Sequence, residues 1–330
     1  MPSSWRSWHR PLLVLAALMA GAAVVSAAGV VLDGRTLVGS PIWLKPFKFA
    51  VSLMIYGLSL AWMLSLSTRA RRTGWWAGTV VAVASVIEMV ILIAQVIRGR
   101  RSHFNLETEL DETLFSVMGN TIVVLWVSSL LIAVLLFRSE LADRASAWAL
   151  RLGAALALIG AALGFLMTMP TSDQLAAEKR GERVDTLGAH SVGVPDDGPS
   201  MPLTGWSTTG GDLRIPHFFG MHALQLLPLL LLALLLLAPR LPRLRDEGVR
   251  LRLILTAAGG YSGLLALLTW QALRGQPLHR PDAATLTALA AILLTTAVAA
   301  RLSLRPSPAR TRAPSPTPAP EPLPDREPAP

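Results

Sequence analysis

Residues 114–137 read LFSVMGNTIVVLWVSSLLIAVLLF, a stretch of 24 residues without a charged side chain. A helix needs roughly 20 predominantly apolar residues to cross the hydrocarbon core of a bilayer. Similar runs recur along the chain, so we expect an all-α, polytopic transmembrane helix bundle of about eight spans. The expected spans cover residues 11–32, 47–66, 75–97, 114–137, 146–169, 217–238, 251–273 and 283–300.

The composition favours a membrane protein over a soluble one. Charged residues make up 15% of the 330-residue chain and hydrophobic residues 52%, and the mean hydropathy is +0.49. A soluble domain carries about 25% charged residues. The net charge of +9 comes from basic residues at helix ends and in the C-terminal tail, not from a folded face shared with aromatics, so nucleic acid is excluded as the expected partner. The lipid bilayer is the expected partner, and the lack of cysteine excludes disulfides and thiolate sites.

The chain divides into a transmembrane bundle, residues 1–303, and a tail, residues 304–330. The tail is rich in Pro, Ala and Ser and buries too little apolar surface to fold, so we expect it to be disordered and cytoplasmic. The long connection 170–216 is polar and contains Gly-Gly and Asp-Asp-Gly turn signals. We expect it to be an extracytoplasmic loop that covers one end of the bundle.

Loop charge orients the bundle, because cytoplasmic connections carry an excess of Lys and Arg. Alternate connections, beginning with the N-terminus, hold 18 basic residues against 12 in the other set. Both termini are therefore expected on the cytoplasmic side of the cell membrane. Residues 1–28 also resemble a secretory signal, since Arg6 and Arg10 precede an apolar stretch that ends in small residues. Cleavage there would leave seven spans but would keep every later loop on its side.

Unusual polar residues gather in three connections that share the outer side. The first block, residues 41–49, reads PIWLKPFKF. Lys45 and Lys48 are two of only three lysines in a chain whose other 27 basic residues are arginine. Lysine is a compact, titratable point charge, so a binding role is as good an explanation for Lys48 as an interfacial one. Snorkelling to the membrane interface is the alternative, and it is the preferred explanation for Lys45.

The second block, residues 102–105, reads SHFN and precedes the 114–137 span. Asn105 is expected to cap a helix that begins at residue 106, which explains this residue without a binding role. His103 has no such local explanation, so it stays a candidate for binding.

The third block, residues 210–225, reads GGDLRIPHFFGMHALQ. Pro216 suits the first turn of a helix, and the free N–H groups at such a helix start attract anions. His222 and Gln225 share a helical face, whereas His217 points about 140° away from His222. These two histidines are therefore not expected to hold one metal ion from within this helix.

The 75–97 span carries Glu88 and Gln95, which lie seven residues apart. They therefore share one face, about 10.5 Å apart along the axis. Glu88 lies near the middle of the membrane, where we expect it to be protonated or paired with Lys48 or another polar neighbour. A structural hydrogen bond and a proton relay are the two interpretations of this carboxyl group.

The blocks WLKPFKF (43–49), SHFN (102–105) and HFFGMHALQ (217–225) resemble those of a group of bacterial polytopic membrane proteins that has no established activity. The resemblance extends over most of residues 40–275. It implies that the three blocks belong together in one bundle of about eight helices, and it implies no catalytic role.

Polar groups at membrane depth usually face the interior of a bundle. We therefore expect a pocket at the outer face, walled by the spans 47–66, 75–97, 114–137, 217–238 and 251–273. The leading hypothesis is binding or translocation of a small polar or anionic solute, with proton coupling through Glu88. The candidate binding or proton-relay residues are Lys48, Glu88, Gln95, His103, His222 and Gln225.

Two other classes of function stay open. In the first, a membrane-embedded enzyme or redox protein holds a metal ion or haem through His103, His190, His217 and His222. In the second, a sensor or assembly factor binds a protein partner through its outer loop. No cofactor motif is present, and the sequence assigns no cofactor and no oligomeric state. It also shows none of the repeats or broken helices that mark well-known transporter folds.

Overall fold

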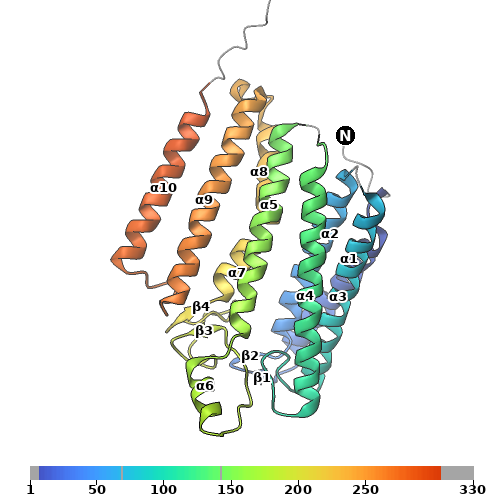
Figure 1. The fold of residues 1–330 in the computed structure, drawn as a ribbon, viewed down its shortest axis with the longest axis vertical. Coiled ribbons are helices and arrows are strands. Elements are labelled where there is room, and N and C mark those ends of the chain that lie inside the picture. Colours follow the sequence, from blue (N-terminus) through green and yellow to red (C-terminus); the bar gives the residue numbers. More distant parts are fainter. Residues whose placement is uncertain (1–6, 68–69, 142, 306–330) are drawn as a thin grey trace, which may run out of the picture.

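The computed structural model describes the chain from residue 7 to residue 305, apart from residues 68–69 and 142. The predicted disordered tail, 304–330, lies almost entirely outside the described residues. Within them the chain is an all-α bundle, as predicted (Figure 1). The α-helices are α1 (Arg10–Leu32), α2 (Leu44–Leu66), α3 (Arg71–Ile97), α4 (Glu109–Arg138), α5 (Arg144–Leu163), α6 (Ser172–Lys179), α7 (Arg214–Met221), α8 (Ala223–Leu237), α9 (Glu247–Leu273) and α10 (Ala283–Ser303). The short strands and 3-10 helices are β1 (Thr36–Leu37), β2 (Ser40–Pro41), β3 (Ser191–Val192), β4 (Gly211–Asp212), η2 (Gly164–Thr168) and η3 (Pro242–Arg245).

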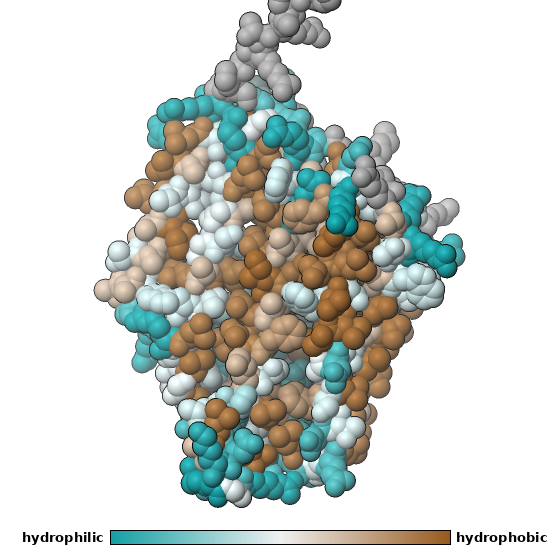
Figure 2. Space-filling model, in the orientation of Figure 1, coloured by the Kyte–Doolittle hydropathy of each residue, from teal (hydrophilic) through white to brown (hydrophobic). Residues whose placement is uncertain are grey.

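The outer surface of the bundle is apolar in the middle. Seven of the described helices are long and apolar enough to cross a membrane, and α7 with α8 makes an eighth crossing if the bent pair counts as one span. Figure 2 shows hydrophobic residues across the middle of the bundle and hydrophilic residues gathered toward both ends. Large side chains such as Val24 and Leu294 are 71% and 65% exposed on this surface. Such a surface is stable against lipid rather than water, so the chain is a multi-pass integral membrane protein.

Several spans begin at a side chain that accepts hydrogen bonds from the first turn, where backbone N–H groups lack helical partners. Aspartates do this for α5, α9 and α10: Asp143, Asp246 and Asp282. The prediction that Asn105 caps the fourth span, α4, is wrong. The helix begins at Glu109, and Thr108 Oγ1 accepts the Asp111 N–H. Asn105 is instead buried and its backbone pairs with Thr186 of the long connection.

The helices form two groups that meet along α4 and α5 (Figure 1). Helices α1 to α4 pack around a core that includes Leu12, Met63 and Val81. Helices α5, α7, α8 and α9 form the second group, and α10 packs on α9. We call the end where α1 begins and α10 ends the terminal end. The opposite end, which holds β1 to β4 and α6, is the loop end (Figure 1).

Three connections meet at the loop end, as predicted. Strands β1 and β2 form a short hairpin before α2, and β3 pairs with β4 within the long connection. The Leu106 N–H, just before α4, donates to Asp185 O of the long connection. Lys48 Nζ of α2 donates to Thr204 O of the same connection at 3.1 Å. These bonds confirm that the three polar blocks share one end of the bundle.

Helix α5 lies at the centre of the bundle, although the 146–169 span is not among the five that the sequence predicts around the pocket. It packs against α4, α7, α8 and α9. A Cβ added to Gly160 would lie 2.4 Å from the carbonyl carbon of Gly220 in α7, and one added to Gly153 would lie 2.9 Å from Ala223 O. Small residues let helix backbones approach this closely inside a membrane. The number of polar residues in a span therefore does not predict its position in the bundle. Helix α5 is central because its small side chains let other helices pack closely against it.

The expected continuous helix 217–238 is also wrong, because the chain bends by 41° between α7 and α8. The bend falls at His222. Near it the Tyr261 hydroxyl of α9 donates to Phe219 O, a carbonyl that would otherwise accept only a helical N–H. Pro228, inside α8, removes a further helical donor. The span is therefore two half-helices, and both pack against α5 and α9.

The glycine contact between α5 and α7 predicts a strong effect of one methyl group. Gly160→Ala forces two backbones apart, and overpacking of this kind costs about 1–3 kcal/mol. We expect a clear fall in the thermal unfolding temperature of the purified protein. This temperature is measured by size-exclusion chromatography of samples heated to a series of temperatures. Gly259→Ala in α9 is the matched control, since a Cβ there meets nothing within 4 Å. Equal unfolding temperatures for the two variants would contradict the proposed role of this contact.

Candidate functional site

A cavity of about 2030 Å³ lies between the two helix groups and reaches the loop end. Helices α2 and α4 form one wall, and α5, α7 and the start of α8 form the other. Leu44 and Met63 both line the cavity. It therefore follows α2 for about 28 Å, at 1.5 Å per residue. Leu60, Met63 and Leu224 line its deep end and belong to the core cluster of α1 to α4.

The walls of this cavity differ in part from those expected. Helix α5 lines it through small residues such as Ala154 and Ala157, whereas among the described residues none of α9 does so. Helix α3 contributes Leu92 and Val96 near the loop end. The close contact between α5 and α7 explains the difference, because α9 packs against both helices and is kept out of the cavity.

Two lysines lie at the start of α2, where the electrostatics do not favour them. The positive end of a helix dipole favours acidic residues, yet α2 has none in its first turn. Lys45 Nζ lies 5.9 Å from the centre of the Phe49 ring and makes no hydrogen bond or ion pair with any described residue. Lys48 Nζ donates to the loop carbonyls of Thr204 and Leu203. Both lysines line the cavity, so they concentrate positive potential at its loop end.

The other cations that line the cavity have carboxylate partners. Arg214, the first residue of α7, forms a 2.6 Å ion pair with Asp212. Arg100 and Arg101 share Glu107. Within the described part of the lining, the two lysines are thus the cations without a carboxylate partner. Three further acids of the lining are exposed: Glu112, Asp173 and Asp197.

His103 lies in the loop between α3 and α4 and lines the cavity. Its Nδ1 is 3.0 Å from Ser102 Oγ, and its ring packs edge-on against Phe49 with centres 5.7 Å apart. Burial lowers the pKa of His103 well below its usual range, and the positive charge of Lys45 lowers it further. The ring is therefore uncharged at neutral pH, and a negative charge nearby would favour its protonation.

His190 and Asp196 form a hydrogen-bonded pair in the long connection. Asp196 Oδ2 lies 2.9 Å from His190 Nδ1, and the backbone N–H groups of His190 and Ser191 also donate to this carboxylate. Burial raises the pKa of Asp196, but these hydrogen bonds outweigh it and the pKa is lowered. Burial lowers the pKa of His190, although its bond to Asp196 acts in the opposite direction. A neutral His190 donates through Nδ1–H and keeps its Nε2 lone pair for a proton or a ligand.

The four histidines predicted as metal ligands are spread over different walls. His103 and His190 both contact the Phe104 ring, with centres 6.1 and 4.8 Å apart. His217 Nδ1 instead donates to Gly160 O at 2.8 Å, which holds α7 on α5. His222 lies at the break between α7 and α8. In the described part of the chain, no group of three or more His, Cys, Asp or Glu is arranged to hold a metal ion.

A second polar level lies deeper in the cavity. The hydroxyl oxygens of Tyr56 and Ser129 are 2.5 Å apart, and Gln225 Nε2 donates to Ser59 Oγ at 3.2 Å. The Oε1 atom of Gln225 is buried without a hydrogen-bond partner among the described residues. A buried acceptor without a partner costs about 1–3 kcal/mol, so a ligand hydroxyl would be stabilised there. Tyr56 lies about 16 Å along α2 from Lys45.

Glu88 and Gln95 of α3 are absent from the described lining of this cavity. Gln95 Nε2 donates to Asp111 Oδ1 at 2.9 Å, and Arg98 binds the same oxygen at 2.7 Å, so these groups join α3 to α4. Glu88 is 1% exposed, and its carboxyl oxygens have no hydrogen-bond partner among the described residues. An ionised carboxylate left unpaired there costs several kcal/mol, so the packing suits the neutral acid. The partner suggested by the sequence, Lys48, is bound to the long connection instead.

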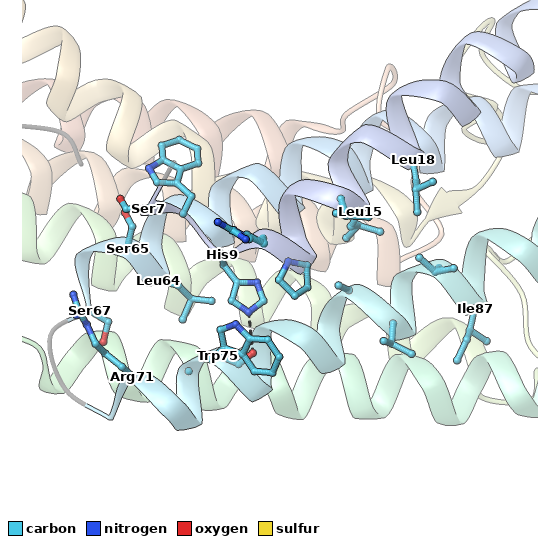
Figure 3. A pocket seen from close by; sticks show the side chains of 18 residues that line it. Ser7, His9, Leu15, Leu18, Leu64, Ser65, Ser67, Arg71, Trp75 and Ile87 are labelled. Atoms are coloured by element: carbon cyan, nitrogen blue, oxygen red, sulfur yellow. Dashed lines mark hydrogen bonds between the residues drawn. The ribbon is translucent and has the colours of Figure 1, made fainter. Parts of the chain in front are cut away.

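A second cavity, of about 990 Å³, lies between α1 and α3 near the terminal end (Figure 3). His9 points into the space between these helices and joins them. Its Nδ1 accepts the Leu12 N–H at the start of α1, and its Nε2 donates to Trp75 O of α3 at 2.9 Å. The sequence analysis assigns His9 no role, because Ser, Thr, Asp and Asn, not His, are the usual signals of a helix start. Both ring nitrogens are engaged, so this histidine serves packing rather than a ligand.

The structure places four of the six candidate residues around the larger cavity: Lys48, His103, His222 and Gln225. Lys45 joins them, although snorkelling was its preferred explanation, and so does Asp196. The missed signal for Lys45 was the first turn of α2, which holds cations and no acid. Comparisons with protein-family models, with curated proteins and with solved structures found no match to this chain.

The unpaired state of Lys45 predicts that its charge is not needed for stability. Lys45→Met keeps the length of the side chain and removes a charge that burial disfavours and that Arg214 and Lys48 repel, against a smaller attraction by Asp196 and Glu88. We therefore expect an unchanged or raised unfolding temperature. Arg98→Met is the contrasting variant, because it leaves the buried Asp111 carboxylate without its cation and costs about 2 kcal/mol. A fall for Lys45→Met as large as that for Arg98→Met would show that Lys45 is a structural residue.

Proposed function

We propose that this protein binds a small anionic solute at the loop end of the larger cavity and moves it across the membrane. One observation carries the proposal: Lys45 lines the cavity with no carboxylate or hydrogen-bond partner among the described residues. A half-buried cation without a partner is stabilised by an anion that enters beside it. Lys48 adds a second charge, and His222 and Gln225 supply hydrogen bonds deeper in the cavity.

The broken span supports translocation over simple binding. Many transporters place their substrate beside discontinuous helices and alternate access by rocking one group of helices against another around that site. Helices α7 and α8 are such a pair, and residues on both sides of their break line the cavity, among them Phe218, Met221 and Gln225. Apolar side chains such as Leu60, Met63 and Leu224 line the deep end of the cavity, so transport requires a path past them.

The proton link in this proposal belongs to His103 and His190 rather than to Glu88. Both histidines line the cavity, whereas Glu88 does not. The charged groups that act on them are Lys45, Arg214 and Asp196. A bound anion adds a negative charge beside Lys45, which raises the pKa of both rings and favours uptake of a proton. Anion binding and proton binding then strengthen each other.

The proposal includes a direction. Loop charge places the loop end outside the cell membrane and both termini in the cytoplasm, because the connections of the terminal end hold more Lys and Arg. The solute then enters from outside, together with its proton.

We expect sulfate to bind the protein in lipid nanodiscs more tightly at pH 5.5 than at pH 7.5. Sulfate keeps its charge over this range, so the change reports protonation of the protein. The affinity rises as the pH falls, by up to about tenfold per pH unit for one linked proton. Isothermal titration calorimetry in two buffers of different ionisation enthalpy measures both the affinity and the number of protons taken up.

Two variants separate the charge from the proton link. Lys45→Met should weaken sulfate binding at both pH values, whereas His103→Gln together with His190→Gln should flatten the pH dependence. Arg252→Gln at the terminal end, far from the cavity, is the matched loss of one charge and should leave binding unchanged. Sulfate binding that is identical in Lys45→Met and in the unaltered protein would refute the proposal.

The proposed orientation has its own test. A reporter that is active only outside the cytoplasm, inserted in the long connection at about residue 195, should be active. The same reporter inserted between α8 and α9, at about residue 241, should be inactive. Reversed activities would place the loop end in the cytoplasm and overturn the direction of uptake.

A further inference from the structure

The larger cavity exceeds the needs of a small anion. Its volume is about 2030 Å³, whereas cavities that hold drug-sized ligands measure about 300–1,000 Å³. Sulfate or a similar ion held at Lys45 would leave most of this space unfilled. A solute that uses the cavity fully must therefore extend from the lysines toward its deep end.

The chemistry of the walls changes along that path. Cationic and polar groups lie at the loop end, and the next polar level, at Tyr56 and Ser129, lies about 16 Å deeper along α2. The walls between the two levels carry large apolar side chains: Phe115, Met118 and Ile122 of α4, with Phe165 and Phe218. The loop end of this path therefore suits the charged head of a solute, and the middle of the path suits an apolar chain attached to that head.

We infer that the solute is a single-chain amphiphile, with an anionic head at Lys45 and Lys48 and an alkyl chain that runs between α2 and α4 toward Tyr56. This inference rests on the proposed anion binding and adds the class of solute. It fits the position of the site, since the head lies at the loop end of the bundle, where the headgroups of the adjacent leaflet also lie. The chain then runs in the same direction as the lipid chains around it.

Gly119 of α4 offers a way to fill the middle of the cavity without disturbing the head site. It lines the cavity, and a Cβ added there meets no atom within 4 Å. Gly119→Trp therefore places a large side chain in the path of the alkyl chain, well below the lysines. Gly21→Trp in α1 is the matched control, because Gly21 is exposed, lines neither cavity and also has no atom within 4 Å of an added Cβ.

The test uses methane-, butane-, octane- and decanesulfonate, whose heads carry the same charge at every pH of interest. Binding to the full-length protein in nanodiscs is measured by equilibrium dialysis, with binding to empty nanodiscs subtracted. We expect the affinity to rise about fourfold for each methylene that enters the cavity, and at least hundredfold from methanesulfonate to octanesulfonate. Gly119→Trp should abolish this rise and keep sulfate binding, and Gly21→Trp should change neither. Gly119→Leu, with a smaller side chain, should reduce the rise and serves as the second variant if Gly119→Trp does not fold.

Two other results would overturn the inference in different ways. If sulfate binds but the affinity does not depend on chain length, or depends on it equally in Gly119→Trp, the solute is a small anion and the proposed function stands alone. If neither sulfate nor any sulfonate binds, the proposed function fails and the inference fails with it.

Discussion

Two glycine backbones meet where α5 crosses α7, and the shape of the bundle depends on that contact. At Gly160 and Gly220 neither helix has a side chain to keep the other away, so α7 lies directly on α5. His217 adds a hydrogen bond to the carbonyl of Gly160 at the same place. With α7 held on α5, and α2 packed on α1 and α3, the space between α2 and α7 is left as a cavity. A larger residue at either glycine would push α7 toward α2 and into this space.

The cavity departs from local rules that other parts of the bundle follow. Helices α5, α9 and α10 begin with aspartate caps, and the buried Asp111 is matched by Arg98. At the cavity, α2 begins with Lys45 and Lys48, and the Oε1 atom of Gln225 is buried without a partner among the described residues. Natural proteins tend to violate such rules at functional sites. These unfavourable features all lie around the larger cavity. A bound anion would stabilise the lysines, and a hydrogen-bond donor on the ligand would stabilise Gln225 Oε1.

The sequence was sufficient for the class of fold and for which blocks meet, but not for the packing of the helices. Runs of about 20 apolar residues predict membrane spans, because the thickness of the bilayer sets that length. Contacts between spans depend on small residues, and Gly153 and Gly160 carried no polar signal that marked α5 as central. Beside the break at His222, Phe219 O accepts the hydroxyl of Tyr261, a residue 39 positions from His222, and no local pattern reveals such a contact. Gln95 was a candidate binding residue because it lies at membrane depth. Its side chain is instead bound to Asp111 of α4, a contact that the sequence of its own helix does not reveal.

The most direct test of an anion site at the start of α2 uses the three lysines of the chain. Lys45 and Lys48 lie at the cavity, and Lys179 is exposed at the end of α6, so it is an internal control. Pulse acetylation at constant ionic strength, followed by mass spectrometry, gives the reaction rate of each lysine with and without saturating sulfate. We expect sulfate to slow acetylation of Lys45 and Lys48 several-fold and to leave the rate at Lys179 unchanged. Equal rates at Lys45 with and without sulfate would contradict it.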